Sequence, residues 1–296
     1  RAFLYTRSAD LGLYIAIFTL MGAAGTSEIA ATLNVDGDTA VAAGLLLLLA
    51  IMGKSAQIPL QDWLMRAMAG PTPVSALLHS ATLVAAGAIL LIRVAPLLTP
   101  EVLLAIGLVG GITTVAAGLI ALAERDLKRL LAASTASQYG LMLIAVGAGV
   151  PLAALLHLLA HAAIKSGLFL AAGEFQHARG GTALERLRGV GRVRPWTFFG
   201  FALAALALVG APPLSGFFSK DAVIAAALSA PSVAWLAPLA LAGTLLTGAY
   251  LARALRLLWH EREEGENENR SVAGARWMGL GVWALVIPAV FLGLTF

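Results

Sequence analysis

The chain has 296 residues, of which 59% are hydrophobic and only 12% charged, and its mean hydropathy is +0.87. Soluble globular chains are about 45–50% apolar and about 25% charged, so this composition excludes a soluble enzyme and a disordered protein. The absence of cysteine excludes disulfides, thiolate metal sites and cysteine-ligated iron–sulfur clusters. The net charge of +4 lies between hydrophobic stretches, so we expect the lipid bilayer as a partner and no nucleic acid.

Hydropathy divides the chain into apolar segments that predict an all-α polytopic membrane protein with about nine transmembrane helices. A spanning helix needs about 20 apolar residues. The nine segments are 10–24, 40–60, 72–96, 101–123, 128–149, 151–176, 196–229, 233–259 and 276–296. We expect them to form one transmembrane domain, residues 1–296. Because the chain begins with Arg1 and no signal peptide precedes it, we also expect it to be a fragment of a longer protein.

Two of the segments contain internal breaks. Gln57-Ile58-Pro59 interrupts the second segment, and the stretch from Ala211 to Gly216, with two prolines, interrupts the seventh. Irregular backbone at membrane depth persists only where protein or a water-filled cavity satisfies the freed polar groups. Paired broken helices therefore indicate an ion or substrate path. The alternative is a proline kink without a role in transport.

The basic residues predict the orientation of the chain. With the N-terminus inside, one basic residue, Arg93, lies at the outer side, and the loop with Glu28, Asp36 and Asp38 also falls outside. This distribution agrees with the positive-inside rule and places the C-terminus outside. The residues on the inner side are Arg1, Arg7, Arg66, Arg125, Lys128, Arg129, Arg179, Arg186, Arg188, Arg192, Arg194, Arg253, Arg256, Arg262, Arg270 and Arg276.

Three of the four lysines lie inside apolar segments, whereas the arginines lie in loops or at segment ends. These lysines are Lys54, Lys165 and Lys220. Arginine keeps its proton in proteins, but a desolvated lysine can release it. An ionisable residue within the membrane is costly and indicates a functional site. The alternative is that each lysine extends to the interface or forms a structural ion pair.

Histidines add to this set. His157, His161 and Lys165 are spaced i, i+4, i+8, so they lie on one face of the sixth segment and suggest a proton relay. His79, in the third segment, is a candidate link between Lys54 and this triplet. A metal or haem site is an alternative, although no cysteine or nearby carboxylate completes it, and so are purely structural histidines.

Four further residues have supporting roles. Asp221 follows Lys220 after the second break, where both are expected near a helix start and Asp221 could cap it. Glu174 ends the sixth segment and is expected at the membrane interface. Arg7 and Asp10, spaced i, i+3, are expected to form a structural ion pair.

Four motifs resemble the antiporter-like subunits of respiratory complex I and of Mrp-type cation/proton antiporters, most of all their L-type branch (chain 5 in mitochondria). The similarity runs along nearly the whole chain. The motifs are residues 53–61 (GKSAQIPLQ), 69–79 (AGPTPVSALLH), 126–138 (DLKRLLAASTASQ) and 215–221 (SGFFSKD).

The resemblance implies two inverted five-helix repeats with discontinuous helices, incomplete at the N-terminus. By motif, Lys54 corresponds to the central pumping lysine and His79 to the histidine after it. His157, His161 and Lys165 correspond to the residues that connect two half-channels, and Lys220 to the terminal lysine. The family pairs its first lysine with a glutamate on an earlier helix, so we expect the acid for Lys54 to come from outside this chain.

The resemblance also implies partners and location. It predicts a proton-translocating subunit in a bacterial cytoplasmic (inner) membrane, assembled with other membrane-arm subunits. NADH, FMN, iron–sulfur clusters and quinone would belong to partner subunits, with no cofactor or metal in this chain. The alternatives are an Mrp-type Na⁺/H⁺ antiporter or related ion-coupled uptake subunit without a redox partner, and a non-conducting membrane scaffold.

Overall fold

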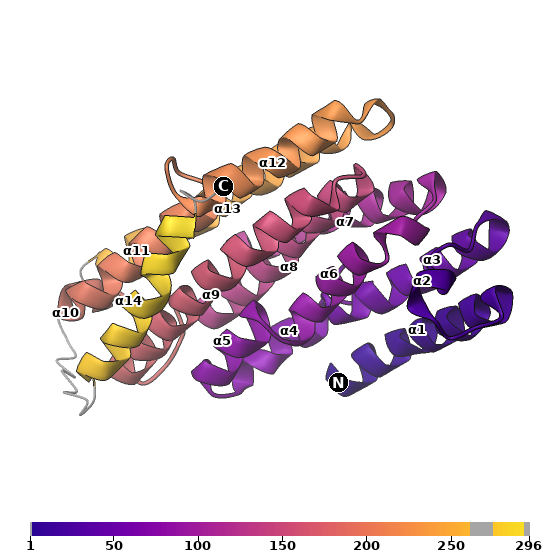
Figure 1. The fold of residues 1–296 in the computed structure, drawn as a ribbon. Coiled ribbons are helices and arrows are strands. Elements are labelled where there is room, and N and C mark those ends of the chain that lie inside the picture. The colour runs from indigo at the N-terminus through magenta and orange to yellow at the C-terminus, as the bar shows by residue number, and fades with distance from the viewer. Residues whose placement is uncertain (1, 261–274, 293–296) are drawn as a thin grey trace.

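The computed structural model describes residues 2–260 and 275–292, and their regular secondary structure is helical (Figure 1). Three short 3₁₀ turns lie at Ala67–Ala69, Ala95–Leu97 and Pro231–Val233. The helices are α1 (Ala2–Ala24), α2 (Ile29–Thr32), α3 (Gly37–Lys54), α4 (Asp62–Arg66), α5 (Thr72–Ser80), α6 (Leu83–Arg93), α7 (Pro100–Ala123), α8 (Leu127–Gly147), α9 (Pro151–Arg179), α10 (Val190–Val193), α11 (Pro195–Val209), α12 (Ser215–Ser229), α13 (Leu236–Trp259) and α14 (Ala275–Phe291).

The helices confirm an all-α, multi-pass membrane protein. Six stretches are long and apolar enough to cross a bilayer: α3, α5 with α6, α7, α8, α9 and α13. Pro195–Val209 and Met278–Phe291 are shorter apolar helices. Each of the nine predicted segments contains helix, and α1 begins at Ala2, well before the predicted start at residue 10.

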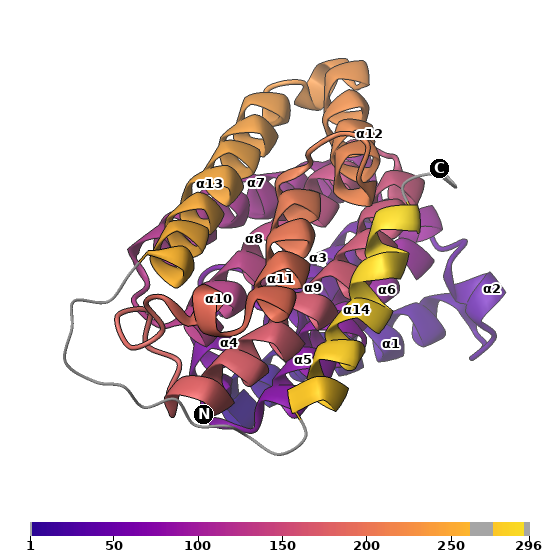
Figure 2. The ribbon, with the colours of Figure 1, turned by 90° about the vertical axis from the view of Figure 1, so that its left-hand side faces the viewer.

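Helix α8 forms the centre of the molecule. Every residue of α8 except Arg129 is buried, and the helix packs against α7, α9, α12 and α13. Small residues allow this packing: a Cβ atom on Gly140 would lie 2.6 Å from the Gly110 carbonyl oxygen of α7. Membrane helices approach closely through such small residues. On the other side, α11 lies between α13 and α14 (Figure 2).

The first predicted break is confirmed. Helix α3 ends at Lys54, and α4 begins only at Asp62. Side chains satisfy the irregular backbone between them: Ser55 Oγ donates to the Val84 carbonyl at 2.8 Å, and Thr113 Oγ1 accepts from the Ile58 N–H at 3.1 Å. This is the protein-satisfied backbone that membrane depth requires.

The second break is confirmed between α11 and α12, but α12 begins earlier than expected. Gly210 takes a positive φ of +95° after α11, and α12 starts at Ser215, with Leu214 in the N-cap position. Asp221 is therefore in the second turn and exposed, so the prediction that it caps the helix is wrong. Lys220 also lies beyond the first turn, where the helix dipole acts most strongly. Both residues lie beyond the first turn because the helix resumes directly after Pro213 and Leu214.

A third break was not predicted. The segment 72–96 is interrupted at Ala81 and Thr82, between α5 and α6. Neither proline nor glycine marks this position. Instead, Ser80 Oγ donates to the Ala76 carbonyl at 2.7 Å and Thr82 Oγ1 to the Leu77 carbonyl at 3.2 Å. Hydroxyl groups that bond nearby carbonyls compete with the helical hydrogen bonds.

Basic side chains connect the helix ends that the sequence predicts on the inner side. Arg253 of α13 donates to the Leu122 and Glu124 carbonyls, and Arg192 donates to the Trp259 carbonyl at 3.1 Å. Helices α5 and α10 also lie toward this end, at the left of Figure 1. Arg1, Arg262 and Arg270, which are also predicted on the inner side, lie outside the described residues.

Candidate functional site

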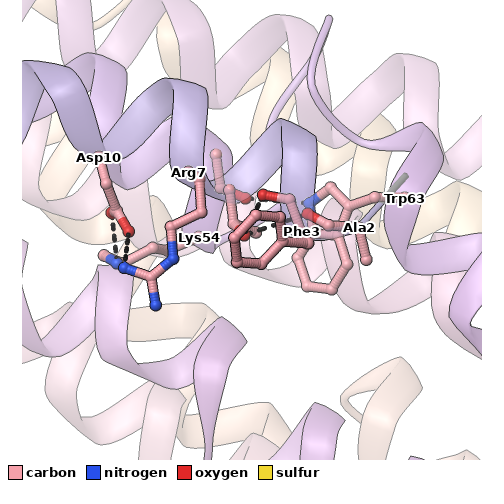
Figure 3. A network of polar contacts seen from close by, with 8 residues as sticks. Ala2, Phe3, Arg7, Asp10, Lys54 and Trp63 are labelled. Atoms are coloured by element: carbon pink, nitrogen blue, oxygen red, sulfur yellow. Dashed lines mark hydrogen bonds and ion pairs between the residues drawn. The ribbon is translucent and has the colours of Figure 1, made fainter.

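One polar cluster joins α1 to the end of α3. Lys54 Nζ lies 2.5 Å from Asp10 Oδ1, and Arg7 Nη1 lies 3.4 Å from Asp10 Oδ2. Figure 3 shows Asp10 facing both cations. The predicted pair of Arg7 with Asp10 is thus confirmed. The expectation that the acid for Lys54 lies outside this chain is wrong, because Asp10 supplies one; with α1 starting at Ala2, Asp10 lies inside a helix that packs on α3.

Small residues and one tryptophan hold this cluster in place. A Cβ atom on Gly53 would lie 2.3 Å from the Ala9 Cβ atom, so glycine is what lets α1 approach α3 at the level of the ion pair. Trp63 Nε1 donates to the Gly53 carbonyl at 2.9 Å (Figure 3 includes Trp63). This bond satisfies a carbonyl that the end of α3 leaves without a helical partner.

Lys165 lies in the middle of the molecule, between α9 and α8. Its side chain is fully buried, and Nζ donates to the Leu131 carbonyl at 2.9 Å and to Ser134 Oγ. Within the described residues, no carboxylate forms an ion pair with this amine. Lys165 is therefore held by neutral oxygens, unlike Lys54.

His79 comes from the last turn of α5 and lies against α9. Its ring stacks on Phe169, with the ring centroids 4.5 Å apart. Neither ring nitrogen has a hydrogen-bond partner among the described protein atoms, and the residue interacts electrostatically with Lys165 and Lys128. Buried ring nitrogens usually bond to protein or to ordered water.

His157 and His161 extend this line toward α12. Their rings are 6.3 Å apart, and the His161 ring lies 5.3 Å from Tyr139 of α8. His157 Nδ1 lies 3.0 Å from Ser219 Oγ, next to Lys220, whose Nζ donates to the Val209 carbonyl at 3.5 Å. All of these side chains are buried, as the predicted shared face requires.

These buried side chains follow one another through the protein, and the set is here called the central line. It runs from α5 through α9 to the second break. On α9, His161 lies one turn from His157 on one side and one turn from Lys165 on the other, and His157 contacts Ser219, the residue before Lys220. In order, the residues are His79, Lys165, His161, His157 and Lys220.

Lys128 is a buried polar residue that the sequence does not single out, because its position suggests an inner loop charge. It is 2% exposed, and its Nζ donates to the Gly70 carbonyl at 2.7 Å. A polar cavity of about 580 Å³ is lined in part by Asp126 and Arg129, which flank Lys128 in the sequence, although Lys128 itself does not line it. The available signal was its residue type: it is a lysine where the other inner basic positions are arginines.

Other polar side chains fall into two groups. Ser134 contacts Lys165, and Gln138 Nε2 donates to Thr247 Oγ1 at 3.2 Å, so both belong to the interior around the central line. Ser137 instead donates to the Thr114 carbonyl at 2.8 Å and joins α8 to α7.

Glu174 is buried and accepts from Thr197 Oγ1 at 2.5 Å, so it contacts α11. In the described parts of the chain, no group of three or more His, Asp and Glu side chains could hold a metal ion.

Comparison with known proteins gives consistent matches. Residues 1–247 match the family described as NADH:quinone oxidoreductase/Mrp antiporter, TM. Subunit L of the NADH-quinone oxidoreductase of Mycobacterium tuberculosis (strain H37Rv) is 40% identical over 308 residues, covering 99% of this chain and 48% of that protein. Subunit L of the Escherichia coli (strain K12) enzyme is 40% identical over 278 residues, 89% of this chain and 45% of the relative.

A solved structure also matches. The structure of the Mrp complex from Dietzia sp. DQ12-45-1b contains a chain 30% identical to this one, with a TM-score of 0.78. The match covers 97% of this chain and 38% of that chain. The chain thus spans about half the length of the curated relatives it matches.

Proposed function

Because this chain belongs to the NADH:quinone oxidoreductase/Mrp antiporter family of membrane proteins, we propose that it translocates protons as part of a redox-driven complex. The observation that carries the proposal is the central line of buried lysines and histidines, which runs from α5 through α9 to the second break. Intramembrane ionisable residues mark proton relays in pumps and transporters. The names of the subunit L relatives support the redox-driven type.

In this proposal, protons pass laterally along the central line. Histidine can accept a proton at one ring nitrogen and release one from the other, which suits His79, His161 and His157 to the relay. The distance of 6.3 Å between the rings of His157 and His161 is too long for a direct hydrogen bond, so water connects them. Lys220, beside the second break, exchanges protons with the outer aqueous phase.

The two ends of the line have different tasks. Protons enter from the inner side through the polar cavity that Asp126 and Arg129, the residues flanking Lys128, help to line. The Lys54–Asp10 ion pair controls proton transfer at the end of the path near the first break. When the pair breaks, an uncompensated positive and an uncompensated negative charge are left near this break. Electrostatic coupling from partner subunits drives the change.

The redox chemistry belongs to partners in this proposal. NADH, FMN, iron–sulfur clusters and quinone would be held by other subunits, and the complex would lie in a bacterial inner membrane. Mass spectrometry of the proteins that co-purify with the native chain in mild detergent tests this point. Flavin and iron–sulfur subunits are the expected result; small membrane subunits alone would contradict the redox-driven type.

The second candidate is Na⁺/H⁺ antiport without redox partners. The match to a chain of the Mrp complex, at a TM-score of 0.78, favours it specifically. This candidate predicts that deletion of the gene causes a loss of growth at alkaline pH that depends on sodium.

Substitution of Lys220 tests proton translocation itself. Lys220→Ala should lower proton pumping by at least about tenfold while the chain still assembles, because the outer exchange group is lost. Lys220→Arg is the matched control for charge, since arginine keeps a charge but does not release its proton. Pumping should fail in both variants. Normal pumping in Lys220→Arg would contradict a proton-carrying role, and normal pumping per assembled complex in both would favour a scaffold.

A further inference from the structure

A second cavity lies at the inner end of α13, apart from the central line. Its volume is about 730 Å³, and it lies between α13, the α7–α8 loop and the segment that follows α9. The polar residues on its wall are Arg125, Arg188, Arg253, Arg256, His260 and Glu185.

The wall is strongly cationic. It presents four guanidinium groups against one carboxylate among the described lining residues. Arg253 is fixed in place because it donates to two backbone carbonyls, and Arg188 lies 3.3 Å from Glu185. Arg125 and Arg256 are exposed. Guanidinium groups bind phosphate through paired hydrogen bonds, so this wall is complementary to a phosphate group.

The cavity continues into an exposed apolar surface. Along α13, the exposed residues are spaced three or four positions apart, so they lie on one face of the helix. Arg256 lies on this face and also lines the cavity. Trp259, which is also exposed, ends the same helix, and the guanidinium group of Arg192 lies 5.7 Å from the centre of its ring. Tryptophan marks the membrane–water interface. The apolar residues of this stripe are Leu241, Leu245, Ala249 and Ala252.

We propose that this cavity binds the headgroup of an anionic phospholipid, with its phosphate at Arg125 and Arg256 and its acyl chains along the α13 stripe. Basic pockets between membrane helices on the inner side bind such headgroups. The stripe favours a lipid over a soluble phosphate, because a soluble anion gains nothing from apolar surface next to the arginines.

Native mass spectrometry tests the proposal on the chain purified in mild detergent. The protein is equilibrated with equal amounts of cardiolipin and phosphatidylcholine, and the retained lipid is counted. Retention of cardiolipin over phosphatidylcholine is expected. Arg125→Gln with Arg256→Gln should lower that retention by about fivefold per arginine, from about 1 kcal/mol for each basic residue near an anionic surface.

The matched control removes the same charge elsewhere. Arg93→Gln with Arg186→Gln changes one arginine at the outer side and one that bonds the Gly180 carbonyl and does not line the cavity. This variant should retain cardiolipin like the unmodified chain. Equal retention of both lipids, equal loss in both double variants, or displacement of cardiolipin by millimolar inorganic phosphate would each overturn the proposal.

Discussion

Lys54 and Lys165 are held in different ways. Lys54, at the edge between α1 and α3, pairs with Asp10, and its side chain is 16% exposed. Lys165, in the centre, is fully buried and bonds to the Leu131 carbonyl and Ser134. If Lys54 loses its proton, Asp10 keeps one cation among the described residues, Arg7. If Lys165 loses its proton, no carboxylate paired with it is left behind in the described part of the chain.

This difference suits Lys54 to the control of proton transfer and Lys165 to the transfer itself. An ion pair at an edge responds to a neighbouring charge by changing partners, and Asp10 already contacts two cations. An amine among neutral oxygens can change protonation with little rearrangement of the protein around it. We therefore expect the same substitution at the two lysines to have different consequences.

The largest effect is expected from Lys165→Met. Proton pumping should fall by at least about tenfold, because the central line loses a member between His79 and His161. Stability should stay the same or rise slightly, since exchanging a buried charged group for an apolar one of similar volume is often neutral or stabilising. Pumping per redox turnover and thermal unfolding in detergent are the measurements.

Lys54→Met is the comparison for that variant. It leaves Asp10 without its nearest cation, and removal of one partner from a buried pair costs about 3–5 kcal/mol, less here because the lysine is partly exposed. Both pumping and thermal stability should therefore fall. A stability loss in Lys165→Met as large as in Lys54→Met would contradict the distinction between the two sites.

The next effect concerns the two breaks. A Cβ atom on Gly216 would lie 1.8 Å from the Ala207 carbonyl oxygen, whereas one on Gly53 would meet the Ala9 side chain at 2.3 Å. Backbone yields less than a side chain, so Gly216→Ala should lower stability more than Gly53→Ala, with overpacking costs of about 1–3 kcal/mol. Gly22→Ala is the control, because nothing lies within 4 Å of its Cβ position. Thermal unfolding of the three variants checks the order; equal losses at Gly216 and Gly22 would contradict it.

The smallest effect is expected at the edge cluster. Asp10→Asn should lower pumping by about fivefold, the low end of the coupling between linked sites, because Lys54 loses its acid. Arg7→Gln should have less effect, since its side chain is 58% exposed and exposed pairs contribute about 0–1 kcal/mol. Pumping per redox turnover decides the order, and a larger loss in Arg7→Gln would show that Arg7 rather than Lys54 is the functional partner of Asp10.

The sequence by itself determined the helices and much of the central line. Long apolar segments must become helices in lipid because their backbone groups have no other partners. The prolines predicted two breaks, and the spacing of His157, His161 and Lys165 predicted a common face, since helical periodicity is a local property. The branch of the family was also apparent from its motifs, as the 40% identity to subunit L proteins confirms.

Only the tertiary structure decided which helix each face meets. Asp10 became the acid of Lys54 because Ala9 and Gly53 let α1 approach α3. Lys128 is buried with its Nζ on the Gly70 carbonyl, a contact between residues 58 positions apart in the sequence. The break at Ala81 and Thr82 likewise carries no proline or glycine signal. Helical periodicity determines which residues share a face, but the packing of helices far apart in sequence determines what that face contacts.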